Sequence, residues 1–267
     1  MKETVIITPT YNKFKKATKP FLDSLYKFTD TNEFDLIIID NNSTDGTLEY
    51  LQEFEKNHDN MTLISNKENL GYSKANNQGM KLALEKGYKY FGILNNDILF
   101  TPDWLKNNIK VFELDEQLGM VASRDAGRPK FFKKKITAEN YLDTYKDYLK
   151  TFKEPLKYML EPLFSCVIVK REVIEKIGLM DENFTPAFWE DQDYCLRTLY
   201  AGFSLATSNS SFVFHNHSTT SSAISKEIYN RNKEYFFKKH PLGKWIWEHK
   251  RSNLIKDIKN YILEGME

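Results

Sequence analysis

Short apolar runs alternate with longer amphipathic stretches over the first hundred residues. The runs cover residues 4–10, 35–40, 61–66 and 88–100. Between them, apolar residues recur at helical spacing, and Gly87 supplies a typical helix end. This alternation of strands and helices predicts an α/β fold, with a mostly parallel sheet covered by helices on both faces.

The pattern is less regular beyond residue 100. Residues 124–160 are rich in Lys and Tyr and indicate an irregular segment followed by a helix. Apolar and acidic patterns then predict a buried strand, two helices and a strand at FVFHNHS. From about residue 225 the chain turns helical, aromatic and lysine-rich. We therefore expect one domain over residues 1–225, with halves at 1–100 and 101–225, and a helical C-terminal extension over 226–267.

Polar side chains follow the predicted strands of the first half. They form three clusters, at Thr8–Asn12, Asp40–Asp45 and Asn95–Asp97. Because the carboxyl ends of parallel strands meet at one edge of a sheet, where ligands bind in such folds, we expect these clusters to line a common site.

Composition and charge narrow the classes of function. The net charge is 38 − 37 = +1, which disfavours nucleic acid as a partner, and 41% hydrophobic residues exclude a disordered chain. Two cysteines suggest a reduced setting, and no signal peptide or membrane span is evident. The sequence thus predicts a cytoplasmic protein, at most peripheral on the inner face of a membrane.

Common nucleotide and hydrolase motifs are missing. The sequence contains no G-x-G-x-x-G after a strand, no P-loop motif and no G-x-S-x-G elbow. Arginine is also scarce, with six of the 38 basic residues, so rigid bidentate phosphate clamps are few.

Asp97 is the first candidate for chemistry. It interrupts the apolar run ILNNDILF, where an ionised carboxylate is costly unless it is paired or bound to a metal. Mg²⁺ and Mn²⁺ favour carboxylate oxygens and often bridge substrate phosphates. A helix cap is the alternative role, since TPDW begins a helix soon after, but Thr101 is better placed to cap.

Two further clusters carry titratable groups. Glu190, Asp191 and Asp193 begin a predicted helix, which is common and stabilising, but the preceding aromatic residues suit a carboxylate that abstracts protons. His215 and His217 lie two residues apart on a predicted strand and therefore face the same side. Either imidazole is a candidate metal ligand or a structural histidine.

Five motifs, in order, resemble those of family-2-type glycosyltransferases of the GT-A fold, and the chain is similar to bacterial rhamnosyltransferase-like enzymes of glycan assembly. The resemblance covers roughly residues 3–222. Its motifs are VIITPTYN, IIIDNNSTDGT, NLGYSKANNQG, ILNNDI and the block from SCVIVK to FWEDQDYCLR. It implies a three-layer GT-A sandwich and an inverting, hexosyltransferase-type enzyme that uses a UDP- or dTDP-sugar.

The resemblance also implies roles for individual residues. Asp191, with Glu190 beside it, would be the general base, and Asp97 and His215 would hold Mn²⁺ or Mg²⁺. The implied nucleotide-sugar pocket comprises Thr8, Pro9, Thr10, Asn12, Asp40, Asn42, Gly71, Asn77, Asn95 and Asn96. Asp40, Asp97, Glu190 and Asp191 would then converge into a locally acidic cleft that needs a divalent cation before it accepts a diphosphate.

Two positions depart from the family pattern. Asn95 replaces the first acidic residue of the metal motif, and Cys166 stands where a smaller residue is common. The first departure motivates an alternative function, a non-catalytic sugar-nucleotide or glycan-binding module. A nucleotidyltransferase is a weaker alternative, since PTYNKFKKA lacks the glycines of an activation loop.

Acceptor and partner contacts are less defined. The acceptor is a glycan, a lipid-linked molecule or a protein. The basic segment GRPKFFKKK is either a solvated loop or a patch for anionic lipid. The aromatic C-terminal tail packs back on the domain or forms a homodimer contact.

Overall fold

The computed structural model describes residues 2–125, 136–150, 153–162, 164–216 and 225–241. GRPKFFKKK, His217 and the last 26 residues lie outside these ranges. In the described part of the chain, no helix has the length and apolar character needed to cross a membrane.

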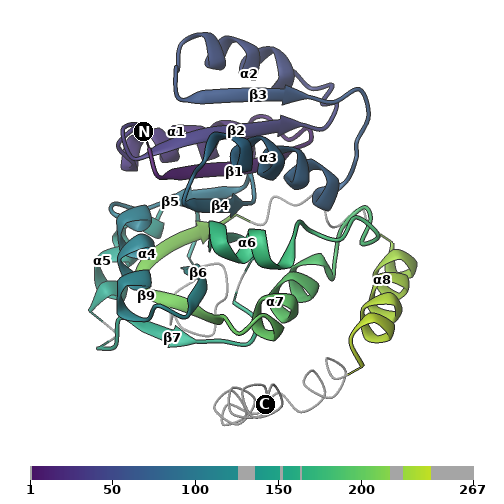
Figure 1. Ribbon diagram of the computed structural model, residues 1–267. Helices are drawn as coiled ribbons and strands as arrows, with labels where there is room; N and C mark the ends of the chain where they lie inside the picture. The colour runs from purple at the N-terminus through teal and green to yellow at the C-terminus, as the bar shows by residue number, and fades with distance from the viewer. Residues whose placement is uncertain (1, 126–135, 151–152, 163, 217–224, 242–267) are drawn as a thin grey trace.

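Strands and helices alternate along the chain (Figure 1). The strands are β1 (Thr4–Thr10), β2 (Phe34–Asp40), β3 (Met61–Ser65), β4 (Tyr90–Leu94), β5 (Ile98–Phe100), β6 (Leu118–Asp125), β7 (Leu156–Tyr158), β8 (Cys166–Lys170) and β9 (Ser204–His215). The α-helices are α1 (Thr18–Phe28), α2 (Thr47–Lys56), α3 (Tyr72–Lys86), α4 (Trp104–Val111), α5 (Tyr141–Leu149), α6 (Arg171–Ile177), α7 (Glu190–Tyr200) and α8 (Lys226–Lys239).

The strands form one mixed sheet in the order β3-β2-β1-β4-β8-β6-β9-β5, with β7 paired to β9. Strands β1 to β4 pair in parallel. In the other half of the sheet, β6 and β9 keep this direction, whereas β5, β7 and β8 run antiparallel to their neighbours. The expected α/β fold with a mostly parallel sheet is confirmed.

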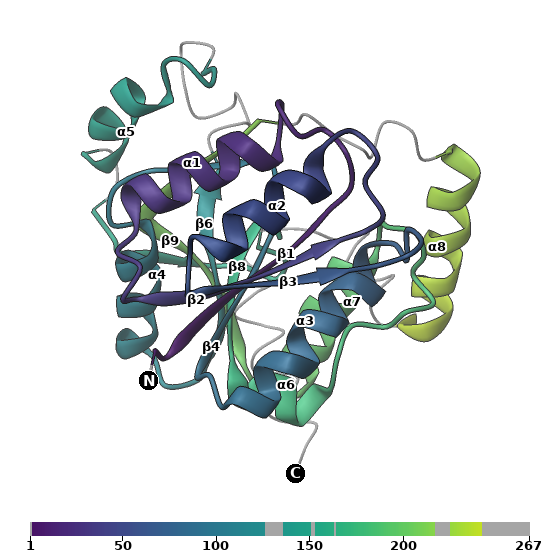
Figure 2. The ribbon, with the colours of Figure 1, turned by 90° about the horizontal axis from the view of Figure 1, so that it is seen from above.

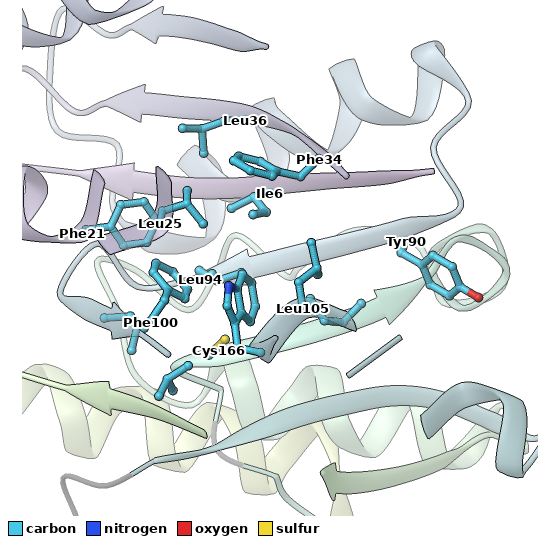
Figure 3. Close-up of a cluster of buried hydrophobic side chains, with 14 of the residues drawn as sticks. Ile6, Phe21, Leu25, Phe34, Leu36, Tyr90, Leu94, Phe100, Leu105 and Cys166 are labelled. Carbon is cyan, nitrogen blue, oxygen red and sulfur yellow. The ribbon is translucent and has the colours of Figure 1, made fainter. Parts of the chain in front are cut away.

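Helices cover both faces of the sheet, which makes three layers (Figure 2). Ile6 of β1 packs with Phe21 and Leu25 of α1 on one face (Figure 3). Ile7, the next residue along β1, packs on the other face with residues of α3. Both faces of the central strands are therefore buried, which explains their continuous apolar runs.

The expected single strand over residues 88–100 is wrong. The structure divides it into β4 and β5, separated by a turn at Asn95–Asp97. Strand β4 pairs with β1 and β8, whereas β5 crosses to the far edge and pairs with β9. The polar residues in this apolar run therefore mark a turn. The turn follows the C-terminal end of β4 and places Asp97 there.

Candidate active site

The candidate site lies at the edge of the sheet where the parallel strands end. Thr10, Asp40 and Ser65 occupy one register at the ends of β1, β2 and β3. Pro9 lies inside β1 opposite Ile39, one step from this edge. The topology therefore brings the first two predicted clusters together.

Two loops at this edge, which we call the N-terminal loops (residues 10–14 and 40–47), are joined by hydrogen bonds. The backbone N–H of Asn12 donates to Ser43 Oγ over 2.8 Å, and the backbone N–H of Thr44 donates to Asn12 Oδ1 over 2.8 Å. Asn12 and Asn42 adopt left-handed backbone conformations, with φ of 54° and 66°, which asparagine tolerates better than most residues. The loops are thus fixed by their own backbone and side chains.

Two polar side chains beside the N-terminal loops have an unused hydrogen-bonding atom. Asp40 is fully buried and accepts from the backbone N–H of Ser43 through Oδ2 over 3.0 Å, while its Oδ1 has no hydrogen-bond partner in the described chain. Thr8 Oγ1, also buried, has none there either. Unpaired buried polar atoms are rare in proteins, and each needs an explanation such as an ordered water, an ion or a ligand.

Gly71 and Asn77 connect α3 to the segment before α7. Gly71 has a φ of +80°, and a Cβ atom built there would lie 2.7 Å from the Pro186 carbonyl oxygen. The neighbouring N–H of Tyr72 donates to that same oxygen over 2.8 Å. Asn77 is buried and bonds the backbone of Met180 and the Glu182 carboxylate. The Asn77 side-chain amide thus bonds the segment before α7 and not the N-terminal loops. The assignment of Asn77 to the nucleotide pocket stays a prediction, which these contacts do not favour.

The two asparagines before Asp97 are held by different parts of the site. Asn95 accepts from the Tyr72 hydroxyl through Oδ1 over 3.2 Å. Asn96 donates from Nδ2 to Thr10 Oγ1 over 2.9 Å. The turn that carries Asp97 is therefore anchored both to α3 and to β1.

Three carboxylates lie close enough to Tyr72 to act on its hydroxyl group electrostatically. Burial raises the pKa of Tyr72, and the negative charges of Glu190, Asp191 and Asp97 raise it further, in that order. We call these three residues the carboxylate cluster. Asp97 comes from the β4–β5 turn and the other two from the start of α7, so residues from two separate elements act on one hydroxyl group. The expected acidic cleft, which also includes Asp40, stays a prediction. The N-terminal loops reach the carboxylate cluster through the Gly71–Tyr72 segment, since the Asn41 side chain donates to the Gly71 carbonyl over 3.4 Å.

Within this cluster, Glu190 is buried and Asp191 is half-buried. Burial and the charge of Asp191 raise the pKa of Glu190 well above the ordinary carboxyl value. Its Oε2 has no hydrogen-bond partner in the described chain. The environment therefore favours the neutral form of Glu190 and leaves Asp191 as the more accessible carboxylate.

His215 lies between two carboxylates. Its Nε2 is 2.9 Å from Asp97 Oδ1, and its Nδ1 is 3.4 Å from Asp125 Oδ2. Asp125 also accepts from the backbone N–H of His215 over 3.2 Å. Burial by itself would lower the pKa of His215, but the hydrogen bonds and charges of Asp125 and Asp97 outweigh it and raise the pKa to about 9.

The donor set suits a divalent cation that a substrate helps to hold. In the described residues, no group of three or more His, Cys, Asp or Glu side chains is arranged to bind a metal. Asp97 and His215 nevertheless supply an oxygen and a nitrogen side by side, and metal-binding histidines usually give their second nitrogen to a carboxylate, as His215 does to Asp125. Mg²⁺ sites often use only one or two protein ligands besides substrate phosphates. The residues present therefore fit such an ion.

Sequence reasoning missed Tyr72 and Asp125. Tyr72 sits inside the NLGYSKANNQG motif, where a tyrosine carries no recognised signal. Asp125 ends β6, and an acidic residue at the carboxyl end of a buried strand is the kind of signal that singled out Asp97. His215 is held as described, whereas His217 lies outside the described residues.

The chain is similar to known glycosyltransferases. A model of the family described as Glycosyl transferase family 2 matches residues 5–178, well over half of the chain. The putative teichuronic acid biosynthesis glycosyltransferase TuaG of Bacillus subtilis (strain 168) is 29% identical over 107 residues, which are 39% of this chain and 40% of the relative. An uncharacterized glycosyltransferase of Methanocaldococcus jannaschii is 25% identical over 118 residues, 44% of this chain and 40% of the relative. The matches thus span less than half of the length of these curated relatives.

Solved structures show the same fold. The mannosyltransferase PcManGT from Pyrobaculum calidifontis, in complex with GDP-Man and Mn²⁺, superposes with a TM-score of 0.62 at 20% identity over 97% of this chain and 68% of that chain. S. aureus TarS 1-349 in complex with UDP gives a TM-score of 0.59 at 20% identity over 87% of this chain and 63% of that chain. The expected GT-A architecture is therefore confirmed.

Proposed function

Because the chain belongs to glycosyl transferase family 2, we propose that it is an inverting, metal-dependent enzyme. It moves a sugar from a UDP- or dTDP-sugar to a hydroxyl group of a glycan, lipid-linked or protein acceptor. The observation that carries this proposal is that Asp97, Glu190 and Asp191 all act electrostatically on Tyr72, while Asp40 and Thr8 at the same edge of the sheet each keep a buried oxygen with no hydrogen-bond partner in the described chain.

Asp191 is the general base of the proposed reaction. It takes the proton from the acceptor hydroxyl as the hydroxyl oxygen attacks the anomeric carbon and the nucleoside diphosphate leaves. The attack occurs opposite to the leaving group in a single displacement, so the anomeric configuration inverts. Burial raises the pKa of Glu190, which favours its neutral form and so limits the negative charge beside the diphosphate.

Asp97 and His215 are the residues that would hold Mn²⁺ or Mg²⁺. When bound, the ion supplies positive charge that stabilises the leaving diphosphate. Asp125 orients the His215 ring through Nδ1, so that Nε2 faces Asp97. Asn95 contributes no charge, and its side-chain oxygen already accepts from Tyr72, which favours weaker metal binding than a second carboxylate would give.

Asp40 and Thr8 are the proposed contacts of the nucleoside. Asp40 Oδ1 is an acceptor for an N–H or hydroxyl group of the base or ribose, and Thr8 Oγ1 is able to donate or accept. Gly71 lets the chain pass close to Pro186 next to this pocket.

A thermal-unfolding series with UDP-, GDP- and dTDP-sugars, with and without Mn²⁺, tests the proposal. A ligand that binds only the folded state stabilises it by about 2.7 kcal/mol at one hundred times its Kd. We expect one nucleotide class to raise the Tm, more strongly with Mn²⁺, and to release its nucleoside diphosphate on incubation. In Asp40→Asn the shift falls, whereas Asp59→Asn, an exposed aspartate of the α2–β3 loop, keeps it.

Two outcomes would contradict the proposal. If no nucleotide sugar changed the Tm, the site would not bind such donors. If one bound tightly with no release of nucleoside diphosphate in the presence of Mn²⁺ and of glycan, lipid-linked and protein acceptors, the protein would be a binding module on the same fold.

A further inference from the structure

Helix α8 lies against the segment that leads into α7. Both views show α8 beside α7 (Figures 1 and 2). The segment between them, residues 185–189, immediately precedes Glu190, and we call it the pre-α7 loop. The C-terminal extension thus packs on its own chain through α8.

Asn232 is the polar centre of this contact. It is 1% exposed, and its side-chain N–H₂ donates to the carbonyl oxygens of Ala187 and Phe188 over 3.0 and 3.1 Å. Its Oδ1 accepts from Arg231, at 3.1 Å from Nε and 2.9 Å from Nη2. Arg231 also donates to the Thr185 carbonyl oxygen. Two adjacent residues of α8 therefore bind three carbonyl groups of the pre-α7 loop.

The pre-α7 loop needs such support. Phe188 and Trp189 have φ of 79° and 75°, a left-handed conformation that bulky residues rarely adopt. Strained conformations of this kind persist only where the surroundings hold them, and they cluster at functional sites. Here the strained residues lie directly before Glu190 and Asp191.

Apolar and ionic contacts fix α8 around this centre. The Trp189 ring packs 5.1 Å from that of Phe236, measured between ring centroids. The fully buried Asp193 of α7 contacts His240 Nε2 and Lys239 Nζ, each at 2.7 Å. From the other side, the N–H of Tyr72 donates to the Pro186 carbonyl oxygen. The pre-α7 loop is therefore held between α3 and α8.

We propose that Asn232, supported by Arg231, is a positioning residue of the active site. By binding the carbonyl groups of the pre-α7 loop, it holds the backbone that sets the position of the Asp191 side chain. This inference rests on the proposed function, because positioning is useful only if Asp191 acts on an acceptor. It gives α8 a role in positioning the general base, away from the N-terminal loops.

Asn232→Asp tests the proposal, because it has nearly the same shape but replaces the N–H₂ donor by an oxygen that repels both carbonyl groups. Asn230→Asp is the matched control, since Asn230 is exposed on the same helix. For each variant, hydrogen exchange of the peptide spanning residues 185–192, the Kd for UDP with Mn²⁺ and the rate of nucleoside diphosphate release are measured.

In Asn232→Asp we expect amide exchange in the pre-α7 loop to rise at least tenfold. We expect turnover to fall at least tenfold, and the Kd for UDP to stay within twofold of wild type. Asn230→Asp leaves all three unchanged. Arg231→Ala, at an exposed position, should show smaller changes in amide exchange and turnover with the same unchanged Kd. If Asn232→Asp does not fold, this variant tests the proposal in its place.

Unchanged exchange in the pre-α7 loop would overturn the proposal, as would unchanged turnover with a loosened loop. A parallel loss of UDP binding and turnover would also overturn it, since that pattern indicates general destabilisation. If the wild-type protein transferred no sugar, the proposed function would fail, and the exchange comparison alone would decide whether Asn232 holds the loop.

Discussion

The N-terminal loops and the carboxylate cluster are built in different ways. The loops follow neighbouring parallel strands, and their hydrogen bonds join residues about 31 positions apart, such as Asn12 and Ser43. The cluster depends on more distant partners. Its Asp97 contacts His215, and Asp125 orients His215 from 90 positions away in the sequence. The order of the parallel strands therefore brings together nearly all of the N-terminal loops. The carboxylate cluster, in contrast, forms only when the whole domain folds. Substitutions of Glu190 or Asp191 should therefore affect turnover and stability without removing nucleotide binding.

Asp191→Asn is the substitution with the largest expected effect. General bases contribute about 10²- to 10⁴-fold to rate, so we expect turnover to fall by that factor. The Kd for UDP should change little, because its proposed contacts, Asp40 and Thr8, belong to the other region. Steady-state release of nucleoside diphosphate, together with UDP titration, measures both quantities.

Glu190→Gln is the control for that substitution. Burial already favours the neutral form of Glu190, so a neutral amide should cost less turnover than Asp191→Asn does. If Asp191→Asn turned over normally while folded, the assignment of the base would be wrong. If it abolished UDP binding, the two regions would not be separable.

The pH dependence of stability next tests His215, the ion-pair partner of Asp97. In the metal-free protein, the folded-state pKa of His215 is about 9, against 6.5 for an ordinary histidine. A raised pKa stabilises the folded state fully below pH 6.5, and this contribution is lost as pH rises through 9. The full contribution is about 3 kcal/mol of unfolding free energy. We expect urea unfolding in EDTA to show this loss in the wild type and not in His215→Gln.

Asp125→Asn provides an intermediate case. It removes one of the two carboxylates that raise the pKa of His215, so part of the pH-dependent loss should remain. Identical slopes for the wild type and His215→Gln between pH 6.5 and 9.5 would show that the ion pairs with Asp97 and Asp125 are not formed in solution.

Gly71→Ala has the smallest expected effect and tests how the two regions are joined. Gly71 and Gly178 have nearly the same backbone conformation, with φ and ψ of 80° and −179° at Gly71 and of 78° and −167° at Gly178. Of the two, only Gly71 would bring a Cβ atom against the Pro186 carbonyl. Alanine should therefore cost about 1–3 kcal/mol at both positions from its backbone conformation, and about 1 kcal/mol more at Gly71 from the contact. Urea unfolding of the two variants isolates the difference. Equal losses would mean that the pre-α7 loop moves away from α3 without cost.

Much of the fold could be predicted from the sequence. The run at residues 4–10 has the same bounds as β1, and β2 and β3 differ from expectation by one residue. The turn at Asn95–Asp97 could not be placed, because β5 finds its partner in β9, more than 100 residues later. Asp97 and Asp191 could be identified because a carboxylate in or beside apolar residues is costly unless it is paired, bound to a metal or used in catalysis.

The sequence by itself determined the parallel β1–β4 arrangement, the edge that carries the site and the residue types gathered there, because alternation and strand ends are local properties of the chain. Only the tertiary structure decided that Asp125 orients His215, that three carboxylates act electrostatically on Tyr72 and that Asn232 binds the pre-α7 loop. These contacts depend on side-chain directions between elements far apart in the chain. No periodicity within any one element encodes them.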